Sequence, residues 1–473
     1  MPISKEHFIK EIGKELVEEN VAIFAGAGLS APAGFVSWSQ LLEPIAEELH
    51  LDIAKEHDLV SLAQYHVNEN AQNRSQLNKR LIEEFSKECT TTQNHEILSR
   101  LPISIYWTTN YDKLIENTLK QQGKKPDVKY TKDHLAITKP KRDAIVYKMH
   151  GDVEHPNDAI LIKDDYESYH VKMEQYLSAL KGDLVSKTFI FIGFSFTDPN
   201  LDYILSRVRI AHNNNQRRHY CFIKKMKKNE NENQADFEYK IRKQNLFIGD
   251  LKRFNIKTVL VEEYNEITEI LSEIERKYRQ RSIFISGAAH EFYKWGKEKS
   301  ELFIHNLSSS LIESEFKIIS GFGLGVGSSV ISGALETIYM NPLKFSNDQL
   351  ILRPFPQSVQ KEQNLKELWK KYREDLISHA GIAIFIFGNK LEDEKVVLSN
   401  GMYEEFKIAQ KQNLVLIPIG ATSYMANKIW EEVKEIYEGD ERLHSIYLEF
   451  GKEDKEPQEI IDLILKFLIQ ISK

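Results

Sequence analysis

Two polar residues in the first third of the chain have side chains that could act on a nucleotide. Asn110 could hold a carboxamide, because its side chain offers both a hydrogen-bond donor and an acceptor. His150 could take a proton from a ribose hydroxyl or from water, because an imidazole titrates near neutral pH. A lone histidine is more often structural, but this one follows an apolar run and precedes a glycine. We take both residues as candidate catalytic groups.

A glycine-rich turn, Gly26-Ala27-Gly28-Leu29-Ser30, precedes both residues and follows the apolar run VAIFA. Glycines at the point where a strand turns into a helix let the backbone approach a phosphate closely. The spacing differs from the G-x-G-x-x-G dinucleotide fingerprint, so a tight structural turn remains an alternative. The turn is a candidate phosphate-binding loop.

Each of these candidates must be positioned by the end of a strand. Asn110 lies in TTNYD after ISIYW, His150 lies in MHGD after AIVYK, and Gly193 opens GFSFTD after FIFI. Such β-branched runs alternate with amphipathic helical stretches, which predicts a largely parallel sheet with helical crossovers. Ligands of open α/β sheets bind beyond the carboxyl ends of strands, so we expect four strand ends to meet at one crevice. Asp112 either lies there or caps the helix DKLIENTLK.

The same pattern restarts near residue 280, which predicts a second domain. A chain of 473 residues is too long for one ordinary hydrophobic core. The charged helix EITEILSEIERKYRQR is followed by SIFISGAA, where strands and helices begin to alternate again. We therefore predict an α/β protein with two Rossmann-like domains, spanning residues 1–280 and 281–473.

The second domain has its own glycine loop, GFGLGVGSS, between the run FKIIS and the helix VISGALETIYM. Alternate glycines at such a place suggest a phosphate nest, although a structural loop is the simpler alternative. The candidates from strand ends are Ser286, Gly287, Gly323 and Gly325. Arg373 could donate two hydrogen bonds to a phosphate, and Glu405 could accept hydrogen bonds from ribose hydroxyls. Each residue taken alone is more often a solvated charge on a helix.

Composition excludes several classes of protein. The net charge of −7, from 63 basic and 70 acidic residues, argues against a general nucleic-acid binder. Cys89 and Cys221 are the only cysteines, so neither a disulfide framework nor a four-cysteine zinc site can form, and we expect no metal. We find no apolar run of about 20 residues and no secretory start. The sequence therefore predicts a cytoplasmic protein without a membrane partner.

The blocks GAGLS, TTNYD, KMHG and GFS, in this order over residues 20–200, resemble the GAGxS, TQNxD, HG and GTS blocks of the sirtuin-type NAD-binding domain. The resemblance implies NAD as substrate. The NAD contacts that it implies are Gly26, Ala27, Gly28, Ser30, Gly193 and Ser195. It also implies that Asn110 and Asp112 lie near the nicotinamide and its ribose, with His150 as the base. Nicotinamide would then leave through an oxocarbenium-like state.

This chain departs from protein-deacylating sirtuins in two places. After Gly34 it reads FVSWSQL, and the paired CxxC motifs of the sirtuin zinc module are missing. Because that module helps to frame the groove for an acylated peptide, water becomes the favoured acceptor and NAD hydrolysis the favoured reaction. A protein deacylase remains an alternative. So does a non-enzymatic nucleotide sensor, which would keep the glycine loops without needing His150.

The blocks SIFISGAA, GFGLGVG and GMYEEF before LVLIPIG resemble SLOG domains, which bind nucleotide-derived ligands. The PGGxGTxxE motif of phosphoribohydrolase members is missing, which favours a sensor. A sirtuin-like domain followed by a SLOG domain is similar to the effectors of the bacterial Thoeris antiphage system. That resemblance implies a homotetramer that depletes cellular NAD after a partner TIR-domain enzyme makes a cyclic ADP-ribose isomer. The isomer would bind near Arg373, Glu405 and Lys390.

Overall fold

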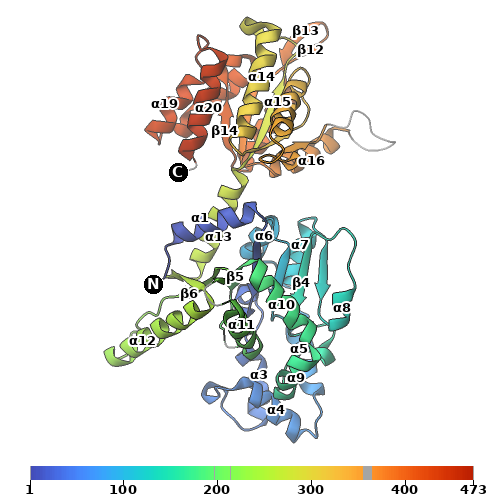
Figure 1. Ribbon diagram of the computed structural model, residues 1–473, viewed down its shortest axis with the longest axis vertical. Helices are drawn as coiled ribbons and strands as arrows, with labels where there is room; N and C mark the ends of the chain where they lie inside the picture. The colour runs from blue at the N-terminus through green and yellow to red at the C-terminus, as the bar shows by residue number, and fades with distance from the viewer. Residues whose placement is uncertain (1, 197, 213–214, 355–364, 472–473) are drawn as a thin grey trace. The chain divides into compact units, whose positions relative to one another are not determined.

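The computed structural model describes residues 2–196, 198–212, 215–354 and 365–471 (Figure 1). The chain divides into two compact units, Met1–Glu275 and Arg276–Lys473, which we call the N-terminal and C-terminal units. The division falls within helix α13 (Asn265–Arg279), whereas the sequence placed it near residue 280, just after this helix. Each unit is built around its own parallel sheet, which confirms the predicted α/β class.

The N-terminal unit contains a seven-stranded parallel sheet in the order β3-β4-β2-β1-β5-β6-β7. Its strands are β1 (Val21–Ala25), β2 (Ile105–Thr108), β3 (Pro126–Lys129), β4 (Ala144–Lys148), β5 (Thr188–Ile192), β6 (His219–Lys224) and β7 (Ile256–Val261). The chain builds outward from β1 through β2 to one edge and then returns to β5 on the other side of β1. The sheet therefore has its topological switch point at β1, which is where ligands bind in open α/β sheets.

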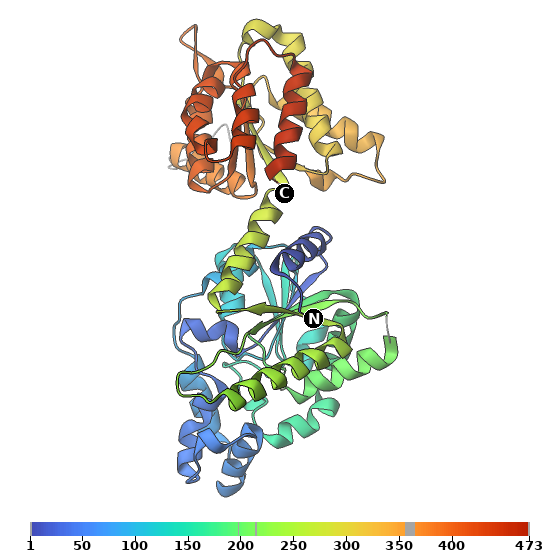
Figure 2. The ribbon, with the colours of Figure 1, turned by 90° about the vertical axis from the view of Figure 1, so that its left-hand side faces the viewer.

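The central strands are buried on both faces. Every residue of β1 and of β5 is buried, as expected for parallel strands that are covered by helices on both sides. The helices of this unit are α1 (Lys5–Val17), α2 (Ala27–Ser30), α3 (Trp38–Glu48), α4 (Leu59–Glu69), α5 (Ser75–Phe85), α6 (Gln93–Arg100), α7 (Leu114–Gln121), α8 (Lys132–Ala136), α9 (Lys163–Lys172), α10 (Glu174–Ser186), α11 (Pro199–His212), α12 (Gln234–Leu251) and α13. Figure 2 shows helices lying on both faces of this sheet.

Helices α3, α4 and α5 form a separate layer beyond one end of the sheet (Figure 1). A capping box starts α3: Ser37 accepts a hydrogen bond from the backbone N–H of Gln40, whose side chain accepts one from Ser37. The buried faces of the three helices share one apolar cluster, which includes Leu42, Leu62 and Tyr111. Because Tyr111 lies directly after Asn110, this cluster fixes the loop that follows β2.

The C-terminal unit contains a five-stranded parallel sheet in the order β10-β9-β8-β11-β14. Its strands are β8 (Ser282–Ala288), β9 (Lys317–Ser320), β10 (Leu350–Leu352), β11 (Ile382–Phe387) and β14 (Val415–Pro418), with a hairpin of β12 (Asn389–Glu392) and β13 (Lys395–Leu398). Its helices are α14 (Gly296–Glu313), α15 (Gly327–Met340), α16 (Leu365–Ser378), α17 (Asn400–Lys411), α18 (Tyr424–Val433), α19 (Glu441–Glu449) and α20 (Pro457–Ile471). Its core is a single apolar cluster that draws on the sheet and on the helices around it.

Two features of the fold were not predicted from the sequence. Strand β3 is short, lies at the edge of its sheet and begins at Pro126, so it lacks the long apolar pattern of the other strands. The hairpin β12–β13 turns through Asp393 and Glu394, both with positive φ, without the glycine that usually marks such a turn. Among the described residues, no helix is both long and apolar enough to cross a membrane.

Candidate active site

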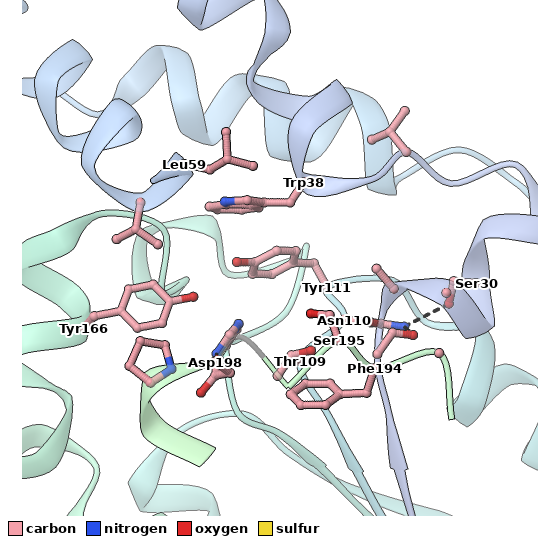
Figure 3. Close-up of a pocket in the computed structure, with 18 of the residues that line it drawn as sticks. Ser30, Trp38, Leu59, Thr109, Asn110, Tyr111, Tyr166, Phe194, Ser195 and Asp198 are labelled. Carbon is pink, nitrogen blue, oxygen red and sulfur yellow. Dashed lines mark hydrogen bonds and ion pairs between the residues drawn. The ribbon is translucent and has the colours of Figure 1, made fainter. Parts of the chain in front are cut away.

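A pocket of about 790 Å³ lies at the carboxyl ends of β1, β2, β4 and β5 (Figure 3). All the sequence-predicted site residues of the N-terminal unit line this pocket. They are Gly26, Ala27, Gly28, Ser30, Asn110, Asp112, His150, Gly193 and Ser195. The structure thus brings the four predicted strand ends to one crevice, and the roles of these residues remain predictions.

The glycine turn after β1 packs directly against the backbone after β5. The N–H of Gly26 donates to the carbonyl of Ile192 (3.0 Å), and the N–H of Gly28 donates to the carbonyl of Gly193 (2.9 Å). Gly193 has a φ of +64°, and a Cβ placed on it would lie 2.1 Å from the backbone nitrogen of Leu29. No side chain fits between the two loops, so together they form one continuous backbone wall of the pocket.

Asn110 is buried, and its side-chain amide is held by the glycine turn. Its Nδ2 donates to the carbonyl of Gly26 (3.1 Å) and to the hydroxyl of Ser30 (3.0 Å, Figure 3). Its backbone N–H donates to the hydroxyl of Thr108. The Nδ2 donor, which we expected to bind a ligand, therefore already has partners within the protein. What Asn110 can still offer to a ligand is its Oδ1 acceptor.

His150 is in contact with a carboxylate that our sequence reasoning did not select. Its Nε2 lies 2.8 Å from Oδ2 of Asp198, and both side chains are more than nine-tenths buried. Burial raises the pKa of Asp198, but the neighbouring His150 and the backbone N–H groups of α11 outweigh this and hold the pKa below its ordinary value. Asp198 is therefore ionised. The signal for it was the acidic residue just before the helix that follows GFSF.

Asp112 both binds the helix that follows it and lines the pocket. Its Oδ1 accepts the N–H of Leu114 (2.9 Å), at the start of α7. Its Oδ2 is buried and has no hydrogen-bond partner in the described part of the chain. The two alternatives from the sequence are therefore compatible, because one oxygen serves the helix and the other remains unpaired beside the pocket.

A fully buried lysine joins the two loops that bear the candidate catalytic residues. Lys148, the last residue of β4, donates to the backbone carbonyls of Tyr111 (3.0 Å) and Asp112 (2.6 Å). It also pairs with Asp152 and with Glu116. Burial by itself would lower the pKa of Lys148. The two carboxylates together have the larger, opposite effect and raise the pKa above its ordinary value, so the ammonium remains charged. A lysine that ends an otherwise apolar strand was the signal for this network in the sequence.

An aromatic wall faces the polar strand ends, and no sequence pattern indicated it. Trp38 from α3 stacks on Tyr111, with ring centroids 6.4 Å apart, and Tyr166 from α9 lies edge-on to His150 at 5.5 Å. Phe85 from α5 also lines the pocket and contacts Tyr111. Figure 3 shows Trp38, Tyr111 and Tyr166 on the side of the pocket away from the glycine turn. Apolar side chains therefore shield part of the site from bulk water.

The C-terminal unit brings only some of its predicted residues together. Ser286 donates to Oε2 of Glu405 (2.6 Å), and Nε of Arg373 lies 3.5 Å from Oε1 of the same carboxylate. Burial raises the pKa of Glu405, although Ser286 and Arg373 act in the opposite direction. Lys390 instead pairs with Glu392 on the β12–β13 hairpin, at 2.9 Å.

The glycines of the C-terminal unit hold two loops in backbone contact. A Cβ on Gly323 would lie 1.9 Å from the carbonyl oxygen of Gly287, and one on Gly325 would lie 2.0 Å from that of Ala289. Gly325 also has a φ of +73°. These contacts account for the glycines structurally, so their role toward a ligand remains a prediction. Among the described residues, no group of His, Cys, Asp or Glu side chains is arranged to hold a metal ion.

Comparisons with known proteins agree with this architecture. Residues 104–246 match the model of the SIR2-like domain, and residues 266–471 match that of the Sir2- and TIR-associating SLOG family. The chain is 55% identical to the NAD(+) hydrolase ThsA of Bacillus cereus (strain MSX-D12), over 98% of both chains. It is 51% identical to the protein of that name from Acinetobacter baumannii (strain 532279), over 90% of this chain and 89% of the relative. For the Enterococcus faecium protein the identity is 42%, over 98% and 99%. The chain therefore belongs to the ThsA family.

Proposed function

We propose that this protein hydrolyses NAD to nicotinamide and ADP-ribose in the pocket of the N-terminal unit. The observation that carries the proposal is the convergence of Asn110, His150 and the two glycine loops on one pocket at the switch point of the sheet. Support also comes from the relatives, which are named NAD(+) hydrolases.

In the proposed reaction the bond between nicotinamide and ribose breaks first. Its electron pair passes to the pyridine nitrogen and neutralises the positive charge there, which leaves an oxocarbenium-like ribose. Water then attacks the ribose carbon and its proton passes to His150. The Oδ1 of Asn110 accepts a hydrogen bond from the carboxamide of nicotinamide, while Nδ2 stays bound to Gly26 and Ser30. The glycine loops let the backbone approach the pyrophosphate.

The aromatic wall supports water rather than a peptide as the acceptor. Trp38 and Tyr111 are stacked beside the strand ends, and Tyr166 lies against His150. An acylated lysine is a much bulkier acceptor than water, and the aromatic side chains that line the pocket leave less room for it. A test of the acceptor therefore needs an acylated peptide, because a deacylase would form acyl-ADP-ribose when one is supplied.

We further propose that the C-terminal unit senses a cyclic ADP-ribose isomer and thereby releases NAD hydrolysis. Arg373 and Glu405 would contact its phosphate and ribose groups, with Lys390 as a third contact. In this proposal a partner TIR-domain enzyme makes the signal during phage infection, and a cytoplasmic homotetramer then depletes NAD. Keeping the sensor separate from the active site is reasonable, because unregulated hydrolysis would harm the cell that makes the enzyme.

The energy required sets a condition on this regulation. Moving an equilibrium from 1:99 to 99:1 requires about 5.5 kcal/mol of differential binding. One charge-assisted hydrogen bond supplies about 1.5 to 3 kcal/mol. Contacts from Arg373 and Glu405 together, or binding to several subunits of one assembly, are therefore needed for a full switch.

The test is nicotinamide release from NAD by the purified full chain, with and without each cyclic ADP-ribose isomer and with an acylated peptide. We expect release only with ligand, no release from Asn110→Ala or His150→Ala, and loss of ligand response in Arg373→Ala. Arg442→Ala, at an exposed position of the same unit, should respond normally. Undiminished release from both active-site variants would refute the enzyme proposal, and ligand-independent release would refute the regulation.

A further inference from the structure

Asp198 and His150 form a buried pair beside the pocket. One side-chain atom of each residue faces the other residue. Nε2 of His150 and Oδ2 of Asp198 are 2.8 Å apart. Both atoms are shut off from solvent, and neither forms a hydrogen bond among the described residues, so their contact is an ion-pair contact defined by its distance. Burying a carboxylate oxygen without any partner costs free energy. The contact with His150 therefore offsets part of the cost of burying Oδ2 of Asp198.

The other oxygen of Asp198 has a separate structural role. Oδ1 accepts the N–H of Leu201 (2.9 Å), and the backbone carbonyl accepts the N–H of Asp202. Asp198 thus caps the start of α11, as an aspartate commonly does. A cap needs only one oxygen, so capping does not explain why Oδ2 is aimed at the imidazole.

The other rings around His150 carry no charge at neutral pH. Tyr166 from α9 lies 5.5 Å away and Tyr111 from the loop after β2 lies 6.4 Å away, measured between ring centroids. Tyr169 donates its hydroxyl to the carbonyl of Met149, next to His150 in the chain. Burial raises the pKa of all three tyrosines well above the ordinary value. None of them can balance a charge on the imidazole.

The carboxylate of Asp165, on α9, already has other partners. Asp165 pairs with Arg74 at 3.4 Å and accepts the backbone N–H groups of Leu161 and Ile162. Asp198 is therefore the ionised group in direct contact with His150 in the described part of the chain.

We infer that Asp198 is the positioning residue of His150, holding the imidazole so that Nε2 carries the hydrogen and Nδ1 takes the proton of the attacking water. This inference rests on the proposed hydrolysis and adds to it the group that orients the base. An ionised carboxylate only accepts, so the nitrogen facing it must be the N–H. Nδ1 is the other ring nitrogen of a side chain that lines the pocket.

The same contact balances charge during the reaction. When the water oxygen bonds to the ribose carbon, one water proton moves to Nδ1 and His150 becomes an imidazolium. The carboxylate of Asp198 then faces a full positive charge in a site with little water. Pairing with the carboxylate lowers the cost of the buried imidazolium, whereas an isolated imidazolium would carry its full desolvation cost. In a serine-protease triad, replacing the equivalent aspartate by asparagine costs about 10⁴-fold in turnover through the wrong tautomer.

The decisive variant is Asp198→Asn, because asparagine caps a helix as well as aspartate does but carries no charge. We expect kcat for NAD to fall by about 10²- to 10⁴-fold, with the KM changed by less than about threefold. Asp198→Ser, which also caps but has a shorter side chain, should lose turnover similarly. Asp440→Asn changes the cap of α19 in the C-terminal unit and should retain full turnover.

A second measurement tests the pair without substrate. In protein labelled with ¹⁵N-histidine, the His150 signals, assigned with His150→Gln, should show hydrogen on Nε2 in the native protein and a different tautomer in Asp198→Asn. If the tautomer is unchanged, the inference is overturned, even if turnover falls. Normal turnover in Asp198→Asn also overturns it. If the native protein does not cleave NAD, the proposed function fails, and the tautomer result alone decides whether Asp198 orients His150.

Discussion

Gly193→Ala should open the joint between the two glycine loops of the N-terminal unit. The added Cβ would lie 2.1 Å from the nitrogen of Leu29 and 2.5 Å from the carbonyl carbon of Gly28, and both atoms belong to the backbone. Real Cβ atoms do not approach other atoms closer than 3.0 Å, so one loop has to move away from the other. The backbone at Gly193 also has a φ of +64°, which disfavours alanine.

The magnitude is the sum of two contributions. A left-handed backbone costs a residue with a Cβ about 1 to 2 kcal/mol. The two hydrogen bonds that join the loops, from Gly26 to Ile192 and from Gly28 to Gly193, contribute about 0.5 to 1.5 kcal/mol each and are lost when the loops separate. We expect a total loss of about 2 to 5 kcal/mol. Gly123→Ala is the control, since its φ is +74° in open space and only the first contribution, about 1 to 2 kcal/mol, applies.

The assay is hydrogen exchange of the amides in β1 and β5, followed by mass spectrometry, with nicotinamide release measured alongside. Gly193→Ala should exchange these amides faster than Gly123→Ala and lose NAD turnover, whereas the control keeps turnover. Equal exchange and equal turnover in the two variants would show that the contact between the loops contributes nothing beyond backbone strain.

Three further predictions concern buried polar groups. Lys148→Met leaves two buried carboxylates without their cation and should cost about 3 to 5 kcal/mol by chemical denaturation, against less than about 1 kcal/mol for Lys113→Met at a more exposed ion pair. Burial lowers the pKa of His219 to about 3, so this ring folds neutral, and stability should be lost as pH falls from about 6.5, the unfolded value, toward 3. His219→Asn keeps a hydrogen-bond acceptor and should reduce this dependence of the free energy of unfolding on pH, measured by denaturation at several pH values. An unchanged pH dependence would contradict the assignment to His219. Ser286→Ala removes the hydroxyl that donates to Glu405 and should lower the stability of the C-terminal unit by about 1 to 3 kcal/mol in calorimetry.

The strand ends of the N-terminal unit could be predicted because their positions obey a general rule. Gly26, Asn110, His150 and Gly193 each come directly after an apolar run, and parallel strands bring such positions to one edge. The rule needs no knowledge of the strand order, so the pocket could be assembled before the topology was known. It gives no distances, which is why the occupied donor of Asn110 was not foreseen.

Residues on helices and in buried networks could not be predicted in this way. Trp38 and Tyr166 belong to helices whose sequence patterns fit ordinary core packing, and only the tertiary fold turns them toward the pocket. Lys148 and Asp198 act through partners that lie far apart in the chain. Lys390 was selected from a family resemblance, and its pairing with Glu392 depends on a hairpin without a sequence signal.

The strand order also determines how the N-terminal unit would respond to a cut in the chain. Residues 137–143 form an exposed connection between α8 and β4. A piece that ends there retains Asn110 and the glycine turn, while the other piece begins with β4 and carries His150 and Gly193. Because β4 lies between β2 and β3, the second piece has to insert a strand into the first. Neither piece alone has a complete pocket, so this unit is suited to fragment complementation, in which activity returns only on reassembly.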